Sequence, residues 1–410
     1  MLYSMSFLFF FIFEKTKQKM KKFLLLICFI SITVYSQVNT EIHVFDIVQN
    51  GLNYNLVNGK NISNNVGYDS QPYFYDNNTV IFASSRKATT DIKMFDLNLG
   101  YQKFISATKT GGEYSPQRIP NSKNISAVRL DNDGLQRFYK YDYKTGSHTE
   151  ILPNLKVAYP AWIDKKTIVA SVIVNDSLHL IISDLNTRTN ITLAKNVGRS
   201  VHKIPNSELM SFISKEKENY WELKSVNPKT KEIKTITSLG NTEDVTWLPN
   251  GILLIASGSS IYKFDPKKDK SPSLFFNFTD ENINNISRIA VNTDGSKLAL
   301  VAEVSPEYLA EAQLQGYNNR DIDAFLKPFA KDVKVYRYPN TLSYEGLDKM
   351  RENYASFFKQ TEDLHCKILK RIVFKDKVID HELVTANGRT FKAVAIYEMK
   401  NGKIVNVTFM

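Results

Sequence analysis

A unit that recurs about every 44 residues constrains the fold of this chain more than any other feature. A proline opens three successive units, and each proline lies 44 residues after the one before it. Three later units keep the pattern without the proline. Repeats of 40 to 50 residues built from short strands are typical of propellers. The sequence therefore predicts six units that open at Pro72, Pro116, Pro160, Val201, Val245 and Arg288.

Each unit has the same internal order of turns and strands. A polar turn leads into an apolar, β-branched run, and a later strand ends at an aspartate. Turns of this composition supply the left-handed residues that tight hairpins need. The turns are Asn121-Ser122, Asp164-Lys165, Asn206-Ser207, Asn250-Gly251 and Asp294-Gly295, and the strand-ending residues include Asp96, Asp142, Asp184 and Asp265.

The last unit, which opens at Arg288, lacks its second half. The missing half has a counterpart near the start of the chain, because Glu41–Asp46 matches the strand Asp91–Asp96. We therefore infer that residues 41–60 supply the outer strands of the last blade and close the ring, which removes open sheet edges. The prediction is an all-β, six-bladed propeller over residues 37–303. The alternative is a pair of β-sandwiches whose spacing arises by chance.

The spacing, the blade-opening proline and the strand-ending aspartate resemble the TolB and WD-like propeller repeats of bacterial envelope proteins. The resemblance implies a fold rather than a reaction. We expect such a propeller to bind a protein, a peptide or a glycan at the mouth of its channel.

The first 36 residues have the pattern of a signal peptide that starts at Met20. Lys21 and Lys22 form a positive start, residues 23–34 form an apolar core, and Ser36 is a small residue before a cleavage site. We therefore expect export to the periplasm or the exterior. The alternative is a two-helix membrane anchor, because residues 7–13 are also apolar.

Charge and cysteine content exclude several classes of protein. The net charge is +11, and 48 basic and 41 acidic residues remain beyond residue 36, which leaves +7. These charges are scattered, so nucleic-acid binding is not expected. Cys28 follows the bulky Ile27, which argues against a lipoprotein cleavage site. After cleavage of the signal peptide, Cys366 is the one cysteine that remains, so no intrachain disulfide is expected.

The periodicity changes at Ser305, where Ser305-Pro306-Glu307 predicts a helix start. A helix to about residue 317, a second over 322–330, a strand over 332–338 and a helix over 347–359 follow. Four hairpin strands finish the chain at 364–374, 378–386, 391–399 and 404–409. The sequence therefore predicts an α+β domain over residues 304–410.

This order resembles the cone-shaped fold of the nuclear transport factor 2-like superfamily, in particular its SnoaL-like members. The matching segments are Tyr317–Phe325, Phe329–Tyr336, Tyr344–Arg351, Val378–Glu382 and Ala395–Ile404. The superfamily includes isomerases, cyclases, dehydratases and non-catalytic modules, and its members commonly dimerise. The resemblance implies a small apolar ligand in the cone and a homodimer through this domain.

The resemblance does not transfer the catalytic set of the ketosteroid isomerases. Their base position falls at Arg337, and their tyrosine donor falls near Gln313. An arginine stays protonated at neutral pH, so Arg337 cannot be a base.

The remaining candidates for acid–base chemistry are His381 with Asp380 or Glu382. Strand alternation places His381 on the face opposite to both acids, and a structural role for this histidine is the alternative. His365 lies on the neighbouring strand. Two histidines and a carboxylate lack any recognised ligand spacing, so neither a metal nor a cofactor is expected. The candidate ligand-binding residues are Tyr336, Tyr354, His365 and His381.

Other motifs do not identify a reaction. The sequence contains no G-x-S-x-G, H-E-x-x-H or C-x-x-C motif, and Asp131–Gly134 is interpreted as a hairpin turn rather than a calcium loop. The first hypothesis is an exported, non-enzymatic binding protein. The second is a SnoaL-like acid–base enzyme acting on a small apolar substrate, and the third is a purely structural scaffold.

Overall fold

The computed structural model describes residues 39–410 except 52, 66, 87–88, 280–282 and 401. The predicted signal peptide lies outside the described residues. Within the described part of the chain, no helix has both the length and the apolar character needed to cross a membrane.

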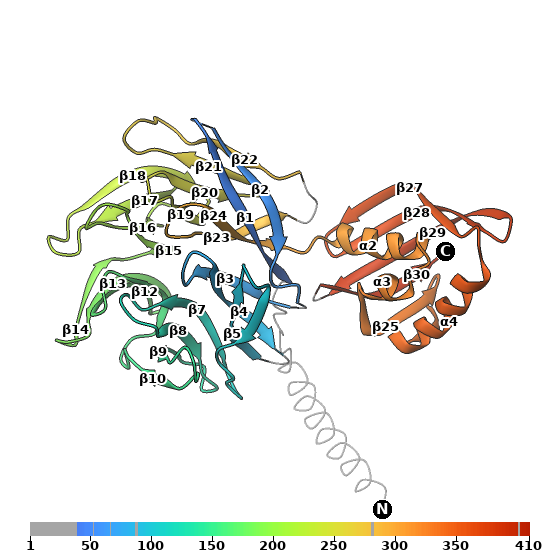
Figure 1. The fold of residues 1–410 in the computed structure, drawn as a ribbon, viewed down its shortest axis with the longest axis horizontal. Coiled ribbons are helices and arrows are strands. Elements are labelled where there is room, and N and C mark those ends of the chain that lie inside the picture. Colours follow the sequence, from blue (N-terminus) through green and yellow to red (C-terminus); the bar gives the residue numbers. More distant parts are fainter. Residues whose placement is uncertain (1–38, 52, 66, 87–88, 280–282, 401) are drawn as a thin grey trace, which may run out of the picture. The chain divides into compact units, whose positions relative to one another are not determined.

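The N-terminal part is a propeller of six blades, each with four antiparallel strands (Figure 1), and one parallel bridge between Thr90 and Gly112 joins the sheets of blades 1 and 2. Blade 1 contains β3 (Asp69–Phe74), β4 (Thr79–Arg86), β5 (Thr89–Asp96) and β6 (Tyr101–Phe104). Blade 2 contains β7 (Gly112–Arg118), β8 (Ile125–Leu130), β9 (Gln136–Tyr141) and β10 (His148–Glu150). Blade 3 contains β11 (Val157–Trp162), β12 (Thr167–Val174), β13 (Ser177–Asp184) and β14 (Thr189–Ala194). Blades 4 and 5 contain β15 (Val197–Lys203), β16 (Met210–Ser214), β17 (Trp221–Val226), β18 (Ile233–Gly240), β19 (Val245–Trp247), β20 (Leu253–Ser257), β21 (Ser260–Phe264) and β22 (Ser273–Asn277).

Blade 6 joins the two ends of the propeller sequence. It contains β23 (Asn284–Val291), β24 (Lys297–Glu303), β1 (Thr40–Asn50) and β2 (Asn53–Asn61), with β1 paired to β24 (Figure 1). The register runs from Thr40 opposite Glu303 to Asp46 opposite Lys297, and the Lys297 Nζ lies 2.6 Å from Asp46 Oδ1. The predicted ring closure is therefore confirmed.

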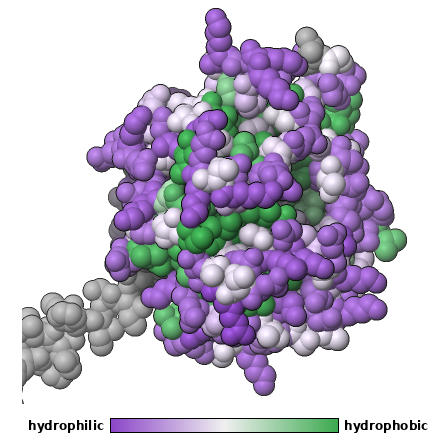
Figure 2. All heavy atoms as spheres, turned by 90° about the vertical axis from the view of Figure 1, so that its left-hand side faces the viewer, coloured by the Kyte–Doolittle hydropathy of each residue, from purple (hydrophilic) through white to green (hydrophobic). Residues whose placement is uncertain are grey.

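Apolar side chains fill the spaces between neighbouring blades. Ile42 and Val301 of blade 6 pack with Val80 and Phe82 of blade 1 in one buried cluster. The view in Figure 2 shows a central apolar region bordered by hydrophilic residues. Packing between neighbouring blades buries the faces of the sheets, and the polar turns remain at the surface.

The C-terminal part is an α+β domain whose sheet has the order β26-β25-β30-β29-β28-β27, with β25 and β30 parallel and the other pairs antiparallel. Its three helices lie against one face of this sheet (Figure 1). The elements are α2 (Pro306–Asn318), α3 (Ile322–Leu326), β25 (Phe329–Arg337), β26 (Thr341–Glu345), α4 (Leu347–Gln360), β27 (His365–Phe374), β28 (Lys377–Ala386), β29 (Arg389–Lys400) and β30 (Lys403–Phe409).

Two elements of this domain differ from the prediction. Helix α3 ends at Leu326 instead of residue 330. Lys327 keeps helical dihedral angles, but Pro328 has no N–H with which to continue the helix, and strand β25 begins at Phe329. Strand β26 was not predicted; it pairs with β25 at the edge of the sheet. The start of α2 is as predicted, since Ser305 Oγ accepts a hydrogen bond from the backbone N–H of Glu307.

Candidate functional site

A cavity of about 160 Å³ lies inside the cone, between the helices and the sheet. Aromatic and aliphatic side chains from every layer of the domain form most of its wall. The lining residues are Gln313, Leu314, Tyr317, Phe325, Phe329, Met350, Tyr354, Cys366, Glu382, Val384, Phe391, Ala393, Tyr397, Val407 and Phe409. Glu382 supplies the one carboxylate among these described lining residues, so the site is an apolar pocket with one polar end.

Three residues form a hydrogen-bonded chain at that polar end. Gln313 Nε2 of α2 lies 3.0 Å from Tyr397 Oη of β29, which donates a hydrogen bond to Glu382 Oε1 of β28 at 3.2 Å. Both strands place these residues on their inner face by alternation. The tyrosine therefore fixes the carboxyl group of Glu382 at the cavity wall.

Burial dominates the electrostatics of this group. Desolvation raises the pKa of Glu382 to about 7; the nearby charge of Asp380 adds to the increase, while the hydrogen bond from Tyr397 opposes it. A carboxyl group with this pKa exchanges a proton near neutral pH, which is the property of a general acid or base. Burial also raises the pKa of Cys366 to about 12, so its thiol remains protonated.

Asp380 faces inward but is engaged elsewhere. Its two carboxylate oxygens lie 2.8 Å from Nε and Nη2 of Arg371, and Arg371 Nη1 lies 2.9 Å from Glu311 Oε2 of α2. The bidentate pair links β27 to β28, and the bond from Arg371 to Glu311 joins the sheet to α2. Asp380 therefore has a structural partner and does not line the cavity.

The two candidate histidines lie on the other side of the sheet. His381 alternates with the inward-facing Asp380 and Glu382, and His365 is exposed and alternates with Cys366, which lines the cavity. In the register of β27 with β28, His381 lies opposite Lys370 and His365 lies opposite Thr385. Strand alternation thus separates His381 from the two acids, and the register of β27 with β28 separates His381 from His365.

The two candidate tyrosines lie on different elements, Tyr354 on α4 and Tyr336 on β25. Tyr354 of α4 lines the cavity, with its ring centroid 4.5 Å from that of Phe325. Tyr336 lines a neighbouring open groove instead. Sequence reasoning overlooked Tyr397, although its place in the alternating set Phe391, Ala393, Ala395, Tyr397 was the signal that could have revealed it.

A second hollow of about 260 Å³ lies where the first strands of the blades meet. Its lining includes Pro72, Pro116 and Pro160 of the repeat. Its charged residues are Arg199, Asp244 and Arg288, with Arg288 Nη1 3.0 Å from Asp244 Oδ1. These groups neutralise one another in part and form no catalytic set.

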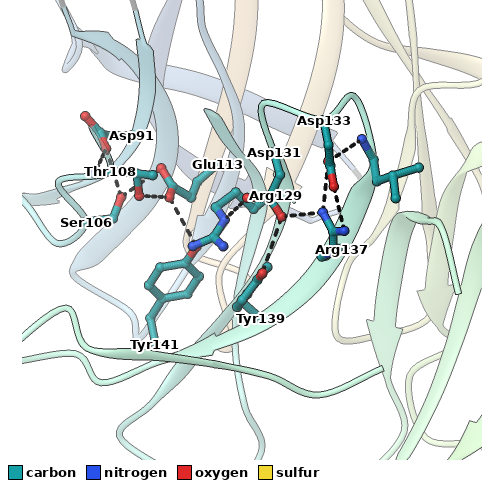
Figure 3. Close-up of polar contacts among 11 residues, drawn as sticks. Asp91, Ser106, Thr108, Glu113, Arg129, Asp131, Asp133, Arg137, Tyr139 and Tyr141 are labelled. Atoms are coloured by element: carbon teal, nitrogen blue, oxygen red, sulfur yellow. Dashed lines mark hydrogen bonds and ion pairs between the residues drawn. The ribbon is translucent and has the colours of Figure 1, made fainter. Parts of the chain in front are cut away.

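Polar networks in blades 1 and 2 provide no metal site. Ser106 Oγ lies 3.4 Å from Asp91 Oδ1 and 3.2 Å from Glu113 Oε2, so it bridges two buried acids (Figure 3). Asp131 and Asp133 pair with Arg129 and Arg137 at the turn between β8 and β9, which confirms a hairpin turn at Asp131–Gly134 (Figure 3). The described residues contain no group of three or more His, Cys, Asp or Glu side chains that could hold a metal ion.

The family model for the SnoaL-like domain matches residues 310–407. The C-terminal domain is a SnoaL-like domain. Among solved structures, it is similar to an uncharacterized cystatin-fold protein from Novosphingobium aromaticivorans, with 24% identity over 26% of this chain and 98% of that chain and a TM-score of 0.25. It is also similar to an NTF2-like protein from Cytophaga hutchinsonii, with 15% identity over 27% of this chain and 91% of that chain and a TM-score of 0.24.

The propeller is similar to the structure of a putative TolB from Agrobacterium tumefaciens. The identity is 12% over 65% of this chain and 99% of that chain, with a TM-score of 0.50. This likeness establishes a TolB-like propeller fold and carries no function with it. No curated protein matched the chain.

Proposed function

We propose that this is an exported envelope protein whose SnoaL-like domain binds a small, mostly apolar molecule and whose propeller is a non-catalytic binding platform. The observation that carries the proposal is the apolar cavity with Glu382 at its polar end. An apolar cavity of about 150 Å³ accommodates a benzene-sized molecule. The favoured ligand is therefore a single ring, or a chain of similar volume, that carries one hydrogen-bonding group.

The cavity can be tested with cyclohexanone, a neutral ring with one acceptor. Protonated Glu382 donates a hydrogen bond to this oxygen, whereas the ionised form does not. Since the pKa of Glu382 is about 7, we expect the dissociation constant to rise about tenfold from pH 6 to pH 8. NMR titration of the full-length protein measures this constant.

Matched variants separate the site from general effects of pH. Glu382→Gln keeps the shape of the side chain and makes binding independent of pH. Glu345→Gln, which changes an exposed acid of the same domain, leaves the pH dependence intact. The proposed function would be rejected if cyclohexanone did not bind at pH 6 and a longer apolar ligand, 6-phenylhexan-1-ol, did not bind either.

Export is supported by the positive start, short apolar core and small residue at 20–36. Mass spectrometry of the mature protein should find an N-terminus at or near Gln37. A protein that keeps Met1 in a membrane fraction would favour the membrane-anchor alternative. The proposed partner of the propeller is a protein, peptide or glycan at the hollow where its first strands meet.

A second candidate function is acid–base catalysis, now with Glu382 rather than His381 as the acting group. The pKa of about 7 and the position of Glu382 at the cavity wall favour it. As a base, Glu382 would remove a proton from the carbon next to a carbonyl group, and Tyr397 would hold the carboxyl group in position. Deuterium exchange from solvent into cyclohexanone, abolished by Glu382→Gln, would support the enzyme; absence of exchange would favour binding alone.

A further inference from the structure

An open groove on the same domain adjoins the cavity. This groove has a volume of about 530 Å³ and lies between α4, β25 and β26. Tyr317, Tyr354 and Phe409 line both spaces. A ligand that passes these three side chains would follow one mostly apolar path from Glu382 to the surface.

The outer part of the groove offers hydrogen-bond donors and a positive charge. Arg337 ends β25 there, and Ser343 and Asn353 are exposed beside it. The groove is lined by Tyr317, Val335, Tyr336, Arg337, Ser343, Tyr344, Asn353, Tyr354, Phe357 and Phe409, and no Asp or Glu occurs among these described residues. None of the described residues forms an ion pair with Arg337. The guanidinium is therefore available to an anion.

The two ends of the path differ in charge. Glu382 at the inner end is a carboxyl group, which repels an anion when it is ionised and offers a single proton when it is not. Arg337 at the outer end is a permanent cation with five N–H donors, a geometry that matches a carboxylate. A molecule that carries an anionic group would therefore bind with its apolar end inward.

We propose that the natural ligand of the SnoaL-like domain is an amphipathic carboxylate, with its apolar end in the cavity and its carboxylate at Arg337. This inference rests on the proposed small-ligand function and adds the class of ligand and its direction. The cavity holds about one ring, so the remaining chain must follow Tyr354 and Phe409 through the groove. Charge-assisted hydrogen bonds to Arg337 then select an acid over a neutral analogue.

The test compares 6-phenylhexanoate with 6-phenylhexan-1-ol, which share a ring and a chain but differ at one end. Calorimetric titration of the full-length protein should show that the acid binds at least tenfold more tightly than the alcohol. Arg337→Gln should remove that difference and leave the affinity for the alcohol unchanged. Arg351→Gln removes an arginine of α4 that pairs with Asp323, and it should leave both affinities unchanged.

Each other outcome has a distinct meaning. Equal binding of acid and alcohol by the unchanged protein would overturn the carboxylate inference and leave the proposed function intact. A preference for the acid that survives Arg337→Gln would also overturn the inference. Binding of neither compound would reject the proposed function itself, provided that cyclohexanone does not bind either.

Discussion

Asp69 and Glu113 occupy the same position in two successive blades, 44 residues apart at the start of the first strand. Each faces an acid of the preceding blade, Glu41 and Asp91 respectively. A serine hydroxyl accompanies each pair: Ser106 bridges the second pair, and Ser63 donates a hydrogen bond to Glu41 in the first. The repeat therefore carries a close pair of acids at two blade junctions, in which Asp69, Asp91 and Glu113 are buried and Glu41 is half-buried.

The two pairs of acids differ in the hydrogen bonds that their carboxyl groups accept. Glu113 accepts hydrogen bonds from the hydroxyls of Thr108 and Tyr141 (Figure 3). Asp69 is fully buried, and neither of its carboxylate oxygens has a hydrogen-bond partner within the described part of the chain. The residue equivalent to Tyr141 in blade 1 is Phe95, which has no hydroxyl group. Burial raises the pKa of both Asp69 and Glu113 to about 7.

The first prediction concerns the dependence of stability on pH. A carboxyl group whose pKa is higher in the folded state binds more protons there than in the unfolded state. Its contribution to the free energy of unfolding is therefore largest below about pH 4 and is lost as pH rises to about 7. Asp69→Asn replaces the carboxyl group by an amide that cannot ionise, so the stability lost at high pH is recovered. The free energy of unfolding at pH 8 should therefore rise by roughly 1–3 kcal/mol.

Urea unfolding at pH 4 and pH 8 measures this effect. At pH 4 the variant should match the unchanged protein, because Asp69 is then protonated. Asp376→Asn, at an exposed hairpin, is the control and should have little effect at either pH. If Asp69→Asn lost the same stability at both pH values, ionisation of Asp69 would not be the cause of the lower stability at pH 8.

Much of the architecture could be predicted because a repeated sequence pattern indicates a repeated structural unit. The blade openings predicted the six blades, and the match of Glu41–Asp46 to Asp91–Asp96 predicted the pairing of β1 with β24. The edge strand β26 gave no such signal, since Thr341–Glu345 is short and mostly exposed. Its pairing depends on the position of β25 rather than on its own sequence.

The candidate site could be predicted only in part. Alternation correctly separated His381 from Asp380 and Glu382, but it could not determine which face of β28 points into the cone. That choice depends on the helices that cover the sheet. Once the inner face is known, Glu382 and Tyr397 meet across β28 and β29, whereas Asp380 is engaged by Arg371.

The second prediction tests ring closure. Ile42 of β1 is fully buried against blade 1, and truncation of a buried isoleucine leaves a cavity. Ile42→Ala should lower the free energy of unfolding by roughly 2–5 kcal/mol. Val48→Ala changes an exposed position of the same strand and should cost less than about 0.5 kcal/mol. Similar effects of the two variants in urea unfolding would mean that β1 is not an integral strand of blade 6.

The third prediction concerns Arg371 and Asp380. Asp380 is fully buried, so Arg371→Gln leaves a buried carboxylate without its partner and should cost roughly 3–5 kcal/mol. The double variant Arg371→Met/Asp380→Leu should recover most of that loss, because no unpaired charge remains. Thermal unfolding of both variants, with Lys370→Gln as the exposed control, measures the difference. A double variant that is as unstable as Arg371→Gln would show that the charge is not the cause.

The last prediction concerns the outer face of the cone sheet. The alternating set Phe391, Ala393, Ala395 and Tyr397 faces inward, so Lys392, Val394, Ile396 and Glu398 face outward. Ile379, His381 and Leu383 of β28 lie beside them on the same outer face and are half-buried. A sheet face that combines these apolar side chains supplies a driving force for association, at roughly 25 cal/mol per Å² of apolar surface buried.

Residues 304–410 contain their own buried core, so we expect this segment to fold alone. Sedimentation should show a dimer at micromolar concentration, formed by the outer faces of two copies across a two-fold axis. Ile396→Asp places a charge in that interface and should give a monomer that remains folded by circular dichroism. Leu342→Asp, at an exposed edge position, should leave the dimer unchanged. A segment that is folded and monomeric at 100 times that concentration, about 0.1 mM, would reject the dimer, since two apolar sheet faces would then gain too little by association to offset the entropy lost on binding.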